Sequence, residues 1–394
     1  MKILHTSDWH IGQNFMGQSR ADEHSAFFLW LYELIIKEDI EVLIVSGDIF
    51  DTGNPPNYAL EIYYNFLKKL LTLANFYVII TAGNHDSIST LKAPKELLEF
   101  LNIFVITSGD ETEDELIPIY KDKILQGVVC AVPFLRDSVV RHSISGQTVT
   151  DKENQLNIGM KQHYTDIYDK AIKFIDDKKL PIIATGHLTT VGSRTSDSER
   201  DIYIGGTLDI GSDFLGKYFD YVALGHLHIN QIVGVDHVRY SGSPIPLSFS
   251  ESKQQKKVNI VQLEDDTVDV QEIDIPLQRE LIVIKGDMDK VLQELDTIKD
   301  PNYWIEIHLK DDNAIFANQT IREYAQELNL IILAIKIDRS AKSLKAKELQ
   351  VTSLEELTPK DVFKRRLDLD NIDDDSLKEQ LEENFNLVYQ EVLS

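Results

Sequence analysis

The sequence has one cysteine and no long hydrophobic run. Because Cys130 is the single cysteine among 394 residues, the chain cannot form an internal disulfide, and such cysteine usage is typical of a reducing compartment. There is no stretch of about 18 uninterrupted apolar residues and no basic-then-apolar leader, so we expect neither a membrane span nor a secretion signal. These absences predict a cytoplasmic protein without a membrane partner.

Positive charge is also scarce. The chain has 40 Lys and Arg residues against 65 Asp and Glu residues, which gives a formal net charge of −25. A free-standing DNA-binding domain usually has a basic face, so composition alone argues against a nucleic-acid ligand. Bound divalent cations would reverse the sign of the charge locally, and a basic partner would do the same elsewhere, so this argument is weak.

The sequence does contain hydrophobic runs that end in a polar side chain. The apolar run over residues 41–45 predicts a buried strand, and Gly47 then ends it beside Asp48. The same order of residues occurs in KILHTSDWH, FYVIITAGNHD, LPIIATGH and YVALGHLH. Because the carboxyl ends of strands in α/β sheets converge on ligand sites, we expect these strand ends to form one pocket.

Alternating strand and helix patterns over residues 1–275 predict an α/β domain with helices layered over a sheet. Helices are expected over 22–37, after Pro55-Pro56, over 94–101 and over 163–179, and loops over 108–115 and 136–160. From about residue 277, a β-α-β-α-β pattern with helices over 288–298 and 319–328 predicts a separate small domain. Past residue 340 we expect helices that dock onto this chain or onto a partner.

Residues with metal-ligand chemistry stand at the predicted strand ends. Their oxygen and imidazole donors, with no thiolate among them, suit manganese, iron or zinc: Asp8, His10, Asp48, Asn84, His187, His226 and His228. If Asp48 bridges two ions, each ion receives four ligands: Asp8, His10, Asp48 and His228 for one, and Asp48, Asn84, His187 and His226 for the other. The other histidines lack this setting and are expected to be structural or surface residues: His5, His24, His142, His163, His237 and His308.

Two ions about 3.5–4 Å apart suit hydrolysis of phosphate esters, because they activate a bridging water as hydroxide and neutralise charge on the phosphoryl oxygens. His85, next to Asn84, is placed to give a proton to the departing oxygen. Asp86 either orients the His85 ring or accepts local backbone N–H groups, and Asp51 either caps the following turn or contacts substrate. The loop over 192–201 either edges the site or is a solvated surface loop.

The motifs resemble the signature of the calcineurin-like metallophosphoesterases, in the order Asp8-x-His10, Gly47-Asp48-x-x-Asp51, Gly83-Asn84-His85-Asp86, Gly186-His187 and Gly225-His226-x-His228. Longer stretches are similar to the SbcD family of bacterial nuclease subunits: HTSDWHIGQNF, VSGDIFDTGNPP, AGNHDS, IIATGHLTTVG, ALGHLH and VRYSGSPIPLSFSE. The resemblance implies a β-sandwich flanked by helices over 1–275, a small α/β capping domain over 276–340, and C-terminal helices that bind an ATPase over 341–394.

The resemblance also implies a DNA nuclease that acts in repair, recombination and replication. Such an enzyme degrades duplex ends as an exonuclease and cuts hairpins and blocked ends as an endonuclease, using two Mn²⁺ ions, with Mg²⁺ or other divalent ions as alternatives. The seven residues above would be the ligands and His85 the proton donor. The ATPase SbcC would bind ATP, which agrees with the lack of a P-loop in this sequence.

The implied assembly is a nucleoid-associated heterotetramer with two copies of each subunit, in which this chain dimerises through helices near residues 57–70 and 94–101. Candidate DNA contacts are Asp51, Arg20, Arg194, Arg200 and the lysines over 253–257, with scattered surface cations as the alternative explanation. Two other functions stay open: a phosphomonoesterase or cyclic-nucleotide phosphodiesterase with the same metal chemistry, and a scaffold with a vestigial metal site that holds an ATPase dimer.

Overall fold

A computed structural model describes residues 1–92, 95–110, 112–140, 149–176, 178–196, 198–199, 210–264, 267–310 and 314–337, together with 363, 381, 384 and 385. The chain divides into two compact units, residues 1–309 with 318–336 and residues 310–317 with 337–394. Within the described ranges, no helix combines the length and the apolar character needed to cross a membrane.

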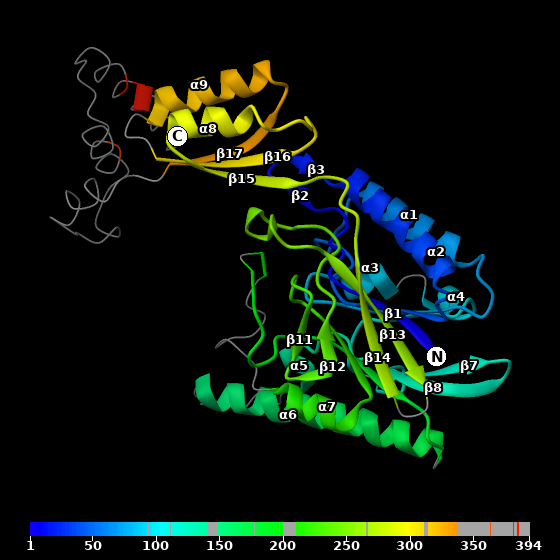
Figure 1. The fold of residues 1–394 in the computed structure, drawn as a ribbon. Helices are drawn as coiled ribbons and strands as arrows, with labels where there is room; N and C mark the ends of the chain where they lie inside the picture. The colour runs from blue at the N-terminus through cyan, green and yellow to red at the C-terminus, as the bar shows by residue number, and fades with distance from the viewer. Residues whose placement is uncertain are drawn as a thin grey trace. The chain divides into compact units, whose positions relative to one another are not determined.

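Two six-stranded sheets form the body of the first unit (Figure 1). The strands of the first sheet are, in spatial order, β14 (Thr267–Asp274), β13 (Lys257–Glu264), β1 (Lys2–Thr6), β4 (Val42–Ser46), β5 (Tyr77–Thr81) and β6 (Ile103–Ile106). Those of the second are β11 (Gln231–Val233), β12 (Val235–Tyr240), β10 (Tyr221–Gly225), β9 (Ile182–His187), β8 (Ile124–Cys130) and β7 (Leu116–Lys121). The central strands of each sheet run parallel.

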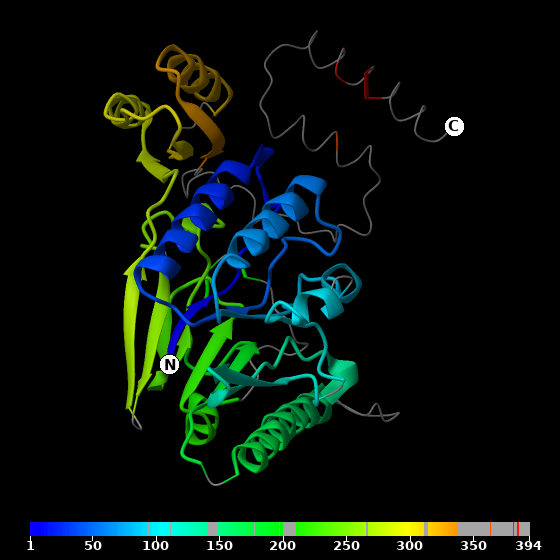
Figure 2. The same cartoon turned by 90° about the vertical axis from the view of Figure 1, so that its right-hand side faces the viewer.

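Hydrophobic residues on both faces of each sheet explain the layering. Between the sheets, Ile3, Ile44 and Ile79 of the first belong to one buried cluster with Val129 and Ile183 of the second. The outer face of the first sheet is covered by α1 (Ala21–Lys37) and α2 (Asn57–Leu70), and that of the second by α6 (Val149–Ile175) and α7 (Ser212–Tyr218) (Figure 2). The predicted helix-flanked β-sandwich is confirmed.

Most predicted helices are present, but the predicted loop over 136–160 is wrong. The structure has α3 (Ile88–Lys92) and α4 (Lys95–Glu99) near the helix expected over 94–101. In the region expected to be a loop, it has α5 (Asp137–Val140) and the first turns of α6. Leu156, Met160 and Tyr164 are buried at helical spacing, so the apolar stripe of α6 begins inside that stretch. The residues between these positions in the first turns of α6 are mostly polar, so the helical spacing of the apolar residues is hard to recognise in the sequence.

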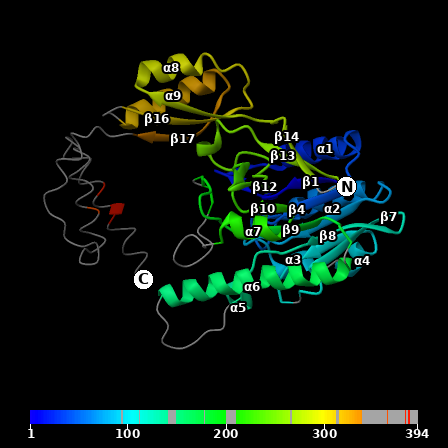
Figure 3. The same ribbon diagram turned by 60° about the horizontal axis from the view of Figure 1, so that its bottom comes forward.

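A three-stranded sheet follows the sandwich in the chain. Its strands are β15 (Leu281–Gly286), β16 (Trp304–Leu309) and β17 (Ile331–Ile337), joined by α8 (Met288–Leu295) and α9 (Ala314–Glu327) (Figure 3). This order confirms the predicted β-α-β-α-β pattern. The Asp287 carboxylate caps α8 by accepting from the Lys290 N–H at 3.0 Å. The predicted C-terminal helices lie outside the described residues, apart from Phe363 and Phe385, whose rings stack 4.1 Å apart, and two helical positions between them.

His5 illustrates the histidines that are expected to be structural. It is fully buried in β1, where its Nε2 lies 3.2 Å from the carbonyl of Leu224 and its Nδ1 lies 2.9 Å from the Tyr221 hydroxyl. Because a carbonyl only accepts, Nε2–H donates to Leu224 and Nδ1 accepts from Tyr221. Burial lowers the pKa of His5 to about 3, so the ring is neutral in the folded protein at neutral pH.

Lowering the pH should therefore destabilise the fold through His5. An unfolded histidine takes up a proton near pH 6.5, whereas folded His5 does so only near pH 3, so stability is lost as the pH falls through that window. We expect this residue to lower the free energy of unfolding by about 2 kcal/mol between pH 7 and pH 5. Urea unfolding at both pH values measures this decrease. The decrease should be smaller in His5→Gln than in the wild type, and it should be as large as in the wild type in His237→Gln. An equal pH dependence in His5→Gln would contradict this assignment.

Candidate metal centre

The candidate ligands follow five strands that end at one edge of the sandwich. In the first sheet β1 leads to Asp8 and His10, β4 to Asp48 and β5 to Asn84; in the second, β9 ends at His187 and β10 leads to His226 and His228. Backbone hydrogen bonds join the loops, since the N–H groups of Asp8 and His10 each donate at 3.0 Å to carbonyls of the Gly47–Asp48 turn. Apart from Asn84, every candidate ligand is at most 4% exposed.

Three groups of side chains at the site bring their donor atoms together: two consist of candidate ligands, and the third is His10, Asp51 and His85. Donor atoms of Asp8, His10 and His228 lie within 4.8 Å of one another, and so do those of Asp48, His187 and His226. Asp48 Oδ2 lies 3.3 Å from His187 Nε2 and 3.6 Å from His10 Nε2. The division of the seven ligands between two ions stays a prediction.

Hydrogen bonding shows that these residues fit a cation. His187 Nδ1 lies 3.0 Å from the carbonyl of Ser46, which only accepts, so Nδ1 carries a proton. His187 Nε2 then faces two oxygens, Asn84 Oδ1 at 3.0 Å and Asp48 Oδ2 at 3.3 Å. His10 Nε2 is buried without a hydrogen-bond partner in the described part of the chain. Oxygen and nitrogen atoms that converge in this way, with one histidine nitrogen left without a partner, are what a divalent ion requires.

The electrostatics also show a need for positive charge. Burial alone would lower the pKa of His187, but the Asp48 carboxylate beside it raises that pKa to about 9. Burial opposes ionisation of Asp48, yet His187 and His10 hold its pKa well below the usual range. A proton on His187 thus balances the buried carboxylate, and a bound cation would replace that proton. Burial and His187 together lower the pKa of His226, which keeps its ring neutral.

Four of the candidate ligands have strained backbone. Asp8, His10, Asp48 and His226 have φ values of 52°, 45°, 50° and 95°, in the left-handed region that non-glycine residues rarely adopt. Such residues cost about 1–3 kcal/mol each and persist where the surrounding structure imposes them. Close packing also requires glycine before Asn84, because a Cβ at Gly83 would lie 2.1 Å from Asp48 Oδ1.

The loop after β5 holds His85 beside the candidate ligands. The backbone N–H of His85 donates to Asp48 Oδ1 at 2.9 Å, and its Nδ1–H donates to the carbonyl of Asp51 at 2.8 Å. Asp86 does not orient this ring. Its carboxylate accepts from the N–H of Gly83 in its own turn and from the N–H groups of Ile49 and Phe50 in the loop after β4, at 2.8–3.1 Å. The prediction that Asp86 orients the His85 ring is therefore wrong, and the alternative of local backbone bonding holds only for Gly83.

The other candidate substrate contacts differ in position. Asp51 lies at the site, with Oδ1 3.2 Å from His10 Nδ1. Arg194 is exposed, and its contact with substrate stays a prediction. Arg20 is 1% exposed and makes paired bonds to Glu23 at 2.6 and 2.7 Å, which contradicts the prediction that it binds a phosphate. Its guanidinium also lies 5.3 Å from the Trp304 ring and joins the small sheet to the sandwich. Arg200 lies outside the described residues.

Among the polar residues around His228, the sequence did not identify Ser198, Glu199 or Glu251 individually. Lys256 was expected to contact DNA, but it is 2% exposed and is bonded to Glu251, so that prediction is wrong. Ser198, Glu199, Glu251 and Lys256 all hydrogen-bond to this residue or to its direct partners. One feature of the sequence could have indicated them: Glu251 and Lys256 follow closely after the apolar stretch PIPLSF. Both side chains are buried in the structure. The loop that carries Ser198 therefore edges the site, as one of its two interpretations proposed.

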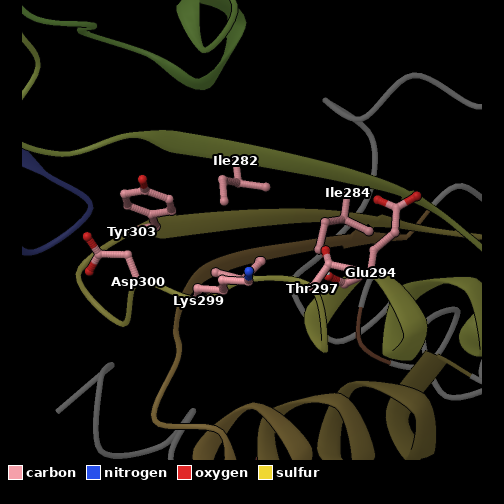
Figure 4. Close-up of a pocket in the computed structure, with 8 residues that line it drawn as sticks. Ile282, Ile284, Glu294, Thr297, Lys299, Asp300 and Tyr303 are labelled. Carbon is pink, nitrogen blue, oxygen red and sulfur yellow. The ribbon is translucent and has the colours of Figure 1, made fainter.

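A cavity of about 370 Å³ lies elsewhere, against the small sheet (Figure 4). It is lined by Ile282, Ile284, Glu294, Thr297, Ile298, Lys299, Asp300 and Tyr303. None of these is a candidate ligand, so this cavity is not part of the metal centre.

Comparison with known proteins identifies the family. Residues 1–230 match the model of the calcineurin-like phosphoesterases, and residues 277–371 match a model described as the type 5 capsule protein repressor C-terminal domain. The chain is 38% identical to the SbcD subunit of the nuclease SbcCD from Escherichia coli K12, over 95% of this chain and 94% of that protein. It is 31% identical to the SbcD subunit of the same nuclease from Bacillus subtilis, over 79% of each chain. The chain therefore belongs to the SbcD family of calcineurin-like phosphoesterases.

Proposed function

We propose that this chain is a DNA nuclease that hydrolyses phosphodiesters with two divalent cations, and that these cations are Mn²⁺. It would degrade duplex ends as an exonuclease and cut hairpins and blocked ends as an endonuclease. The observation that carries the proposal is the convergence of oxygen and nitrogen donors in two groups on either side of Asp48. The relatives named nuclease support the reaction class.

The chain's own residues would bind and orient the reacting groups. One ion would be held by Asp8, His10 and His228, the other by Asn84, His187 and His226, and Asp48 would be shared. When bound, the two cations supply an activated water and neutralise charge on the phosphoryl oxygens. In its imidazolium form, His85 would donate a proton to the departing oxygen from Nε2, because its Nδ1–H is held by the Asp51 carbonyl.

Replacing His85 by Ala should lower turnover about 10²–10⁴-fold, the usual contribution of a general acid. Bound metal should be unchanged, because the ring is not a proposed ligand. Cleavage of an end-labelled duplex measures turnover, and elemental analysis measures metal. His237→Ala, which alters a half-buried histidine of β12, should retain turnover and metal. Near-normal turnover in His85→Ala would end the proposed role.

A lysine-lined groove favours DNA over a small substrate. The groove, of about 790 Å³, is bounded by residues 13–16 and 247–253 of the sandwich and by the small sheet, and Lys253, Lys285, Lys290 and Lys336 line it. Lys290 and Lys336 also pair with Glu294 and Glu306. Gln13 lines the groove and its N–H donates to the His10 carbonyl at 3.1 Å, so the groove begins near the metal centre. In a chain with a net charge of −25, such a concentration of lysines suits a phosphate backbone.

A substrate comparison tests the proposed function. With added Mn²⁺ the chain should cleave an end-labelled DNA duplex and an aryl phosphodiester, and Asp48→Asn should abolish both activities because it removes the shared carboxylate. Hydrolysis of an aryl phosphomonoester alone would favour the small-substrate phosphatase. Absence of activity on all three substrates would favour the scaffold with a vestigial metal site.

We also propose an assembly with SbcC. Large apolar side chains lie exposed on and after α4, with Leu97 at 68%, Phe100 at 92% and Leu101 at 41%, and a second copy of the chain would cover them. Residues 276–340 would act as the capping domain, and residues 341–394 would bind the ATPase. Two copies of each subunit would then form the nucleoid-associated complex.

A chain truncated after residue 340 should separate these two contacts. Light scattering should still give the mass of a dimer, and Mn²⁺-dependent cleavage should persist, because the dimer surface and the metal centre lie in the retained part. Co-purification with SbcC should be lost. A truncated chain that still binds the ATPase would contradict the assignment of the C-terminal segment, and a monomeric full-length chain would contradict the dimer.

A further inference from the structure

Two loops that are distant in the sequence enclose His228. One follows β9 and supplies Ser198 and Glu199; the other follows β12 and supplies Glu251 and Lys256. The backbone N–H of His228 donates to Glu199 Oε1 at 2.8 Å, and Lys256 Nζ donates to the His228 carbonyl at 2.9 Å. The main chain of His228 is therefore held on both sides.

The surrounding groups also decide which nitrogen of the His228 ring carries the proton. Nδ1 lies 2.6 Å from Ser198 Oγ, and the Ser198 hydroxyl donates to Glu251 Oε1. A serine hydroxyl has one proton, and here the carboxylate receives it. The Ser198 oxygen must then accept from His228 Nδ1–H. The lone pair of Nε2 is left free.

Glu251 can serve as this acceptor because a buried ion pair keeps it charged. Its Oε2 accepts from Lys256 Nζ at 2.5 Å and from the Leu247 N–H at 3.1 Å. Glu251 is 0% exposed and Lys256 is 2% exposed. Neutralising either member would leave the other as an uncompensated buried charge. The carboxylate is therefore a permanent acceptor at the end of the hydrogen-bond chain.

We propose that Ser198 and Glu251 are positioning residues that hold His228 in the tautomer whose Nε2 can bind a metal ion. This inference rests on the proposed two-metal function, in which His228 is a ligand. Carboxylates behind metal-binding histidines orient the ring and raise its basicity. Here the carboxylate acts through one serine hydroxyl, whereas His187 reaches the same tautomer through the carbonyl of Ser46.

Mn²⁺ binding to the full-length, metal-free chain tests the relay. In calorimetric titrations the wild type should bind two Mn²⁺ ions, and Ser198→Ala should bind one of them about 10–100-fold more weakly, the usual cost of losing such a partner. Ser198→Thr keeps the hydroxyl and should bind both ions normally. Ser193 lies in the same loop, and its hydroxyl donates to the Thr190 carbonyl. Ser193→Ala removes this hydroxyl and should also bind both Mn²⁺ ions normally.

Nitrogen NMR of the ¹⁵N-histidine-labelled, metal-free chain gives a second readout. The His228 signal, assigned by its loss in His228→Gln, should show a protonated Nδ1 in the wild type and in Ser198→Thr, and should lose this preference in Ser198→Ala. Because Ser198→Ala leaves the Glu251–Lys256 pair intact, its thermal unfolding should match that of the wild type. Normal binding of both ions and an unchanged tautomer in Ser198→Ala would overturn the relay. A wild type that binds no Mn²⁺ would instead overturn the two-metal function.

Discussion

The structure depends on the burial of two carboxylates, Asp8 and Asp48, where two sheets meet. Moving a carboxylate out of water costs several kcal/mol, and the fold offsets part of this cost with fixed donors. The His226 N–H and the Ser7 hydroxyl donate to Asp8, and the His85 N–H donates to Asp48. Backbone donors carry no net charge, so the negative charge is not cancelled. Protonation of His187 balances part of it, and divalent cations would balance all of it.

This arrangement explains why four of the candidate ligands have strained backbone. A strand that continued in extended conformation would carry its next side chains past the edge of the sheet. A left-handed residue instead turns the chain sharply, which brings Asp8 and Asp48 back toward the second sheet. The sandwich tolerates the strain because its strands are buried on both faces and are held by ladders of hydrogen bonds on both sides. The stability of the core thus maintains the geometry of the site.

The same physics sets what can be predicted from the sequence. Asp48 and the other strand-end residues are recognisable because each directly follows a hydrophobic run, and parallel strands bring such ends together. Arg20 is misleading because two of the contacts that bury it, with the carbonyl of Pro246 and the ring of Trp304, are made with residues more than 200 positions away. Glu251 is unrecognised for the same reason, since its contact with Ser198 joins two loops without periodicity. Local pattern reveals ligands on strands, whereas side chains that act through tertiary contacts leave no periodic signal.

The acidic composition and a DNA substrate are compatible once charge is considered by position. A net charge of −25 repels a phosphate backbone over most of the surface, so attraction is confined to places where positive charge is concentrated. In the proposed function these places are the two cations and the groove of Lys253, Lys285, Lys290 and Lys336. If the bound cations also contacted the scissile phosphate, metal loading would control both DNA binding and cleavage. Repulsion elsewhere would then discourage unproductive binding, which a uniformly basic nuclease cannot avoid.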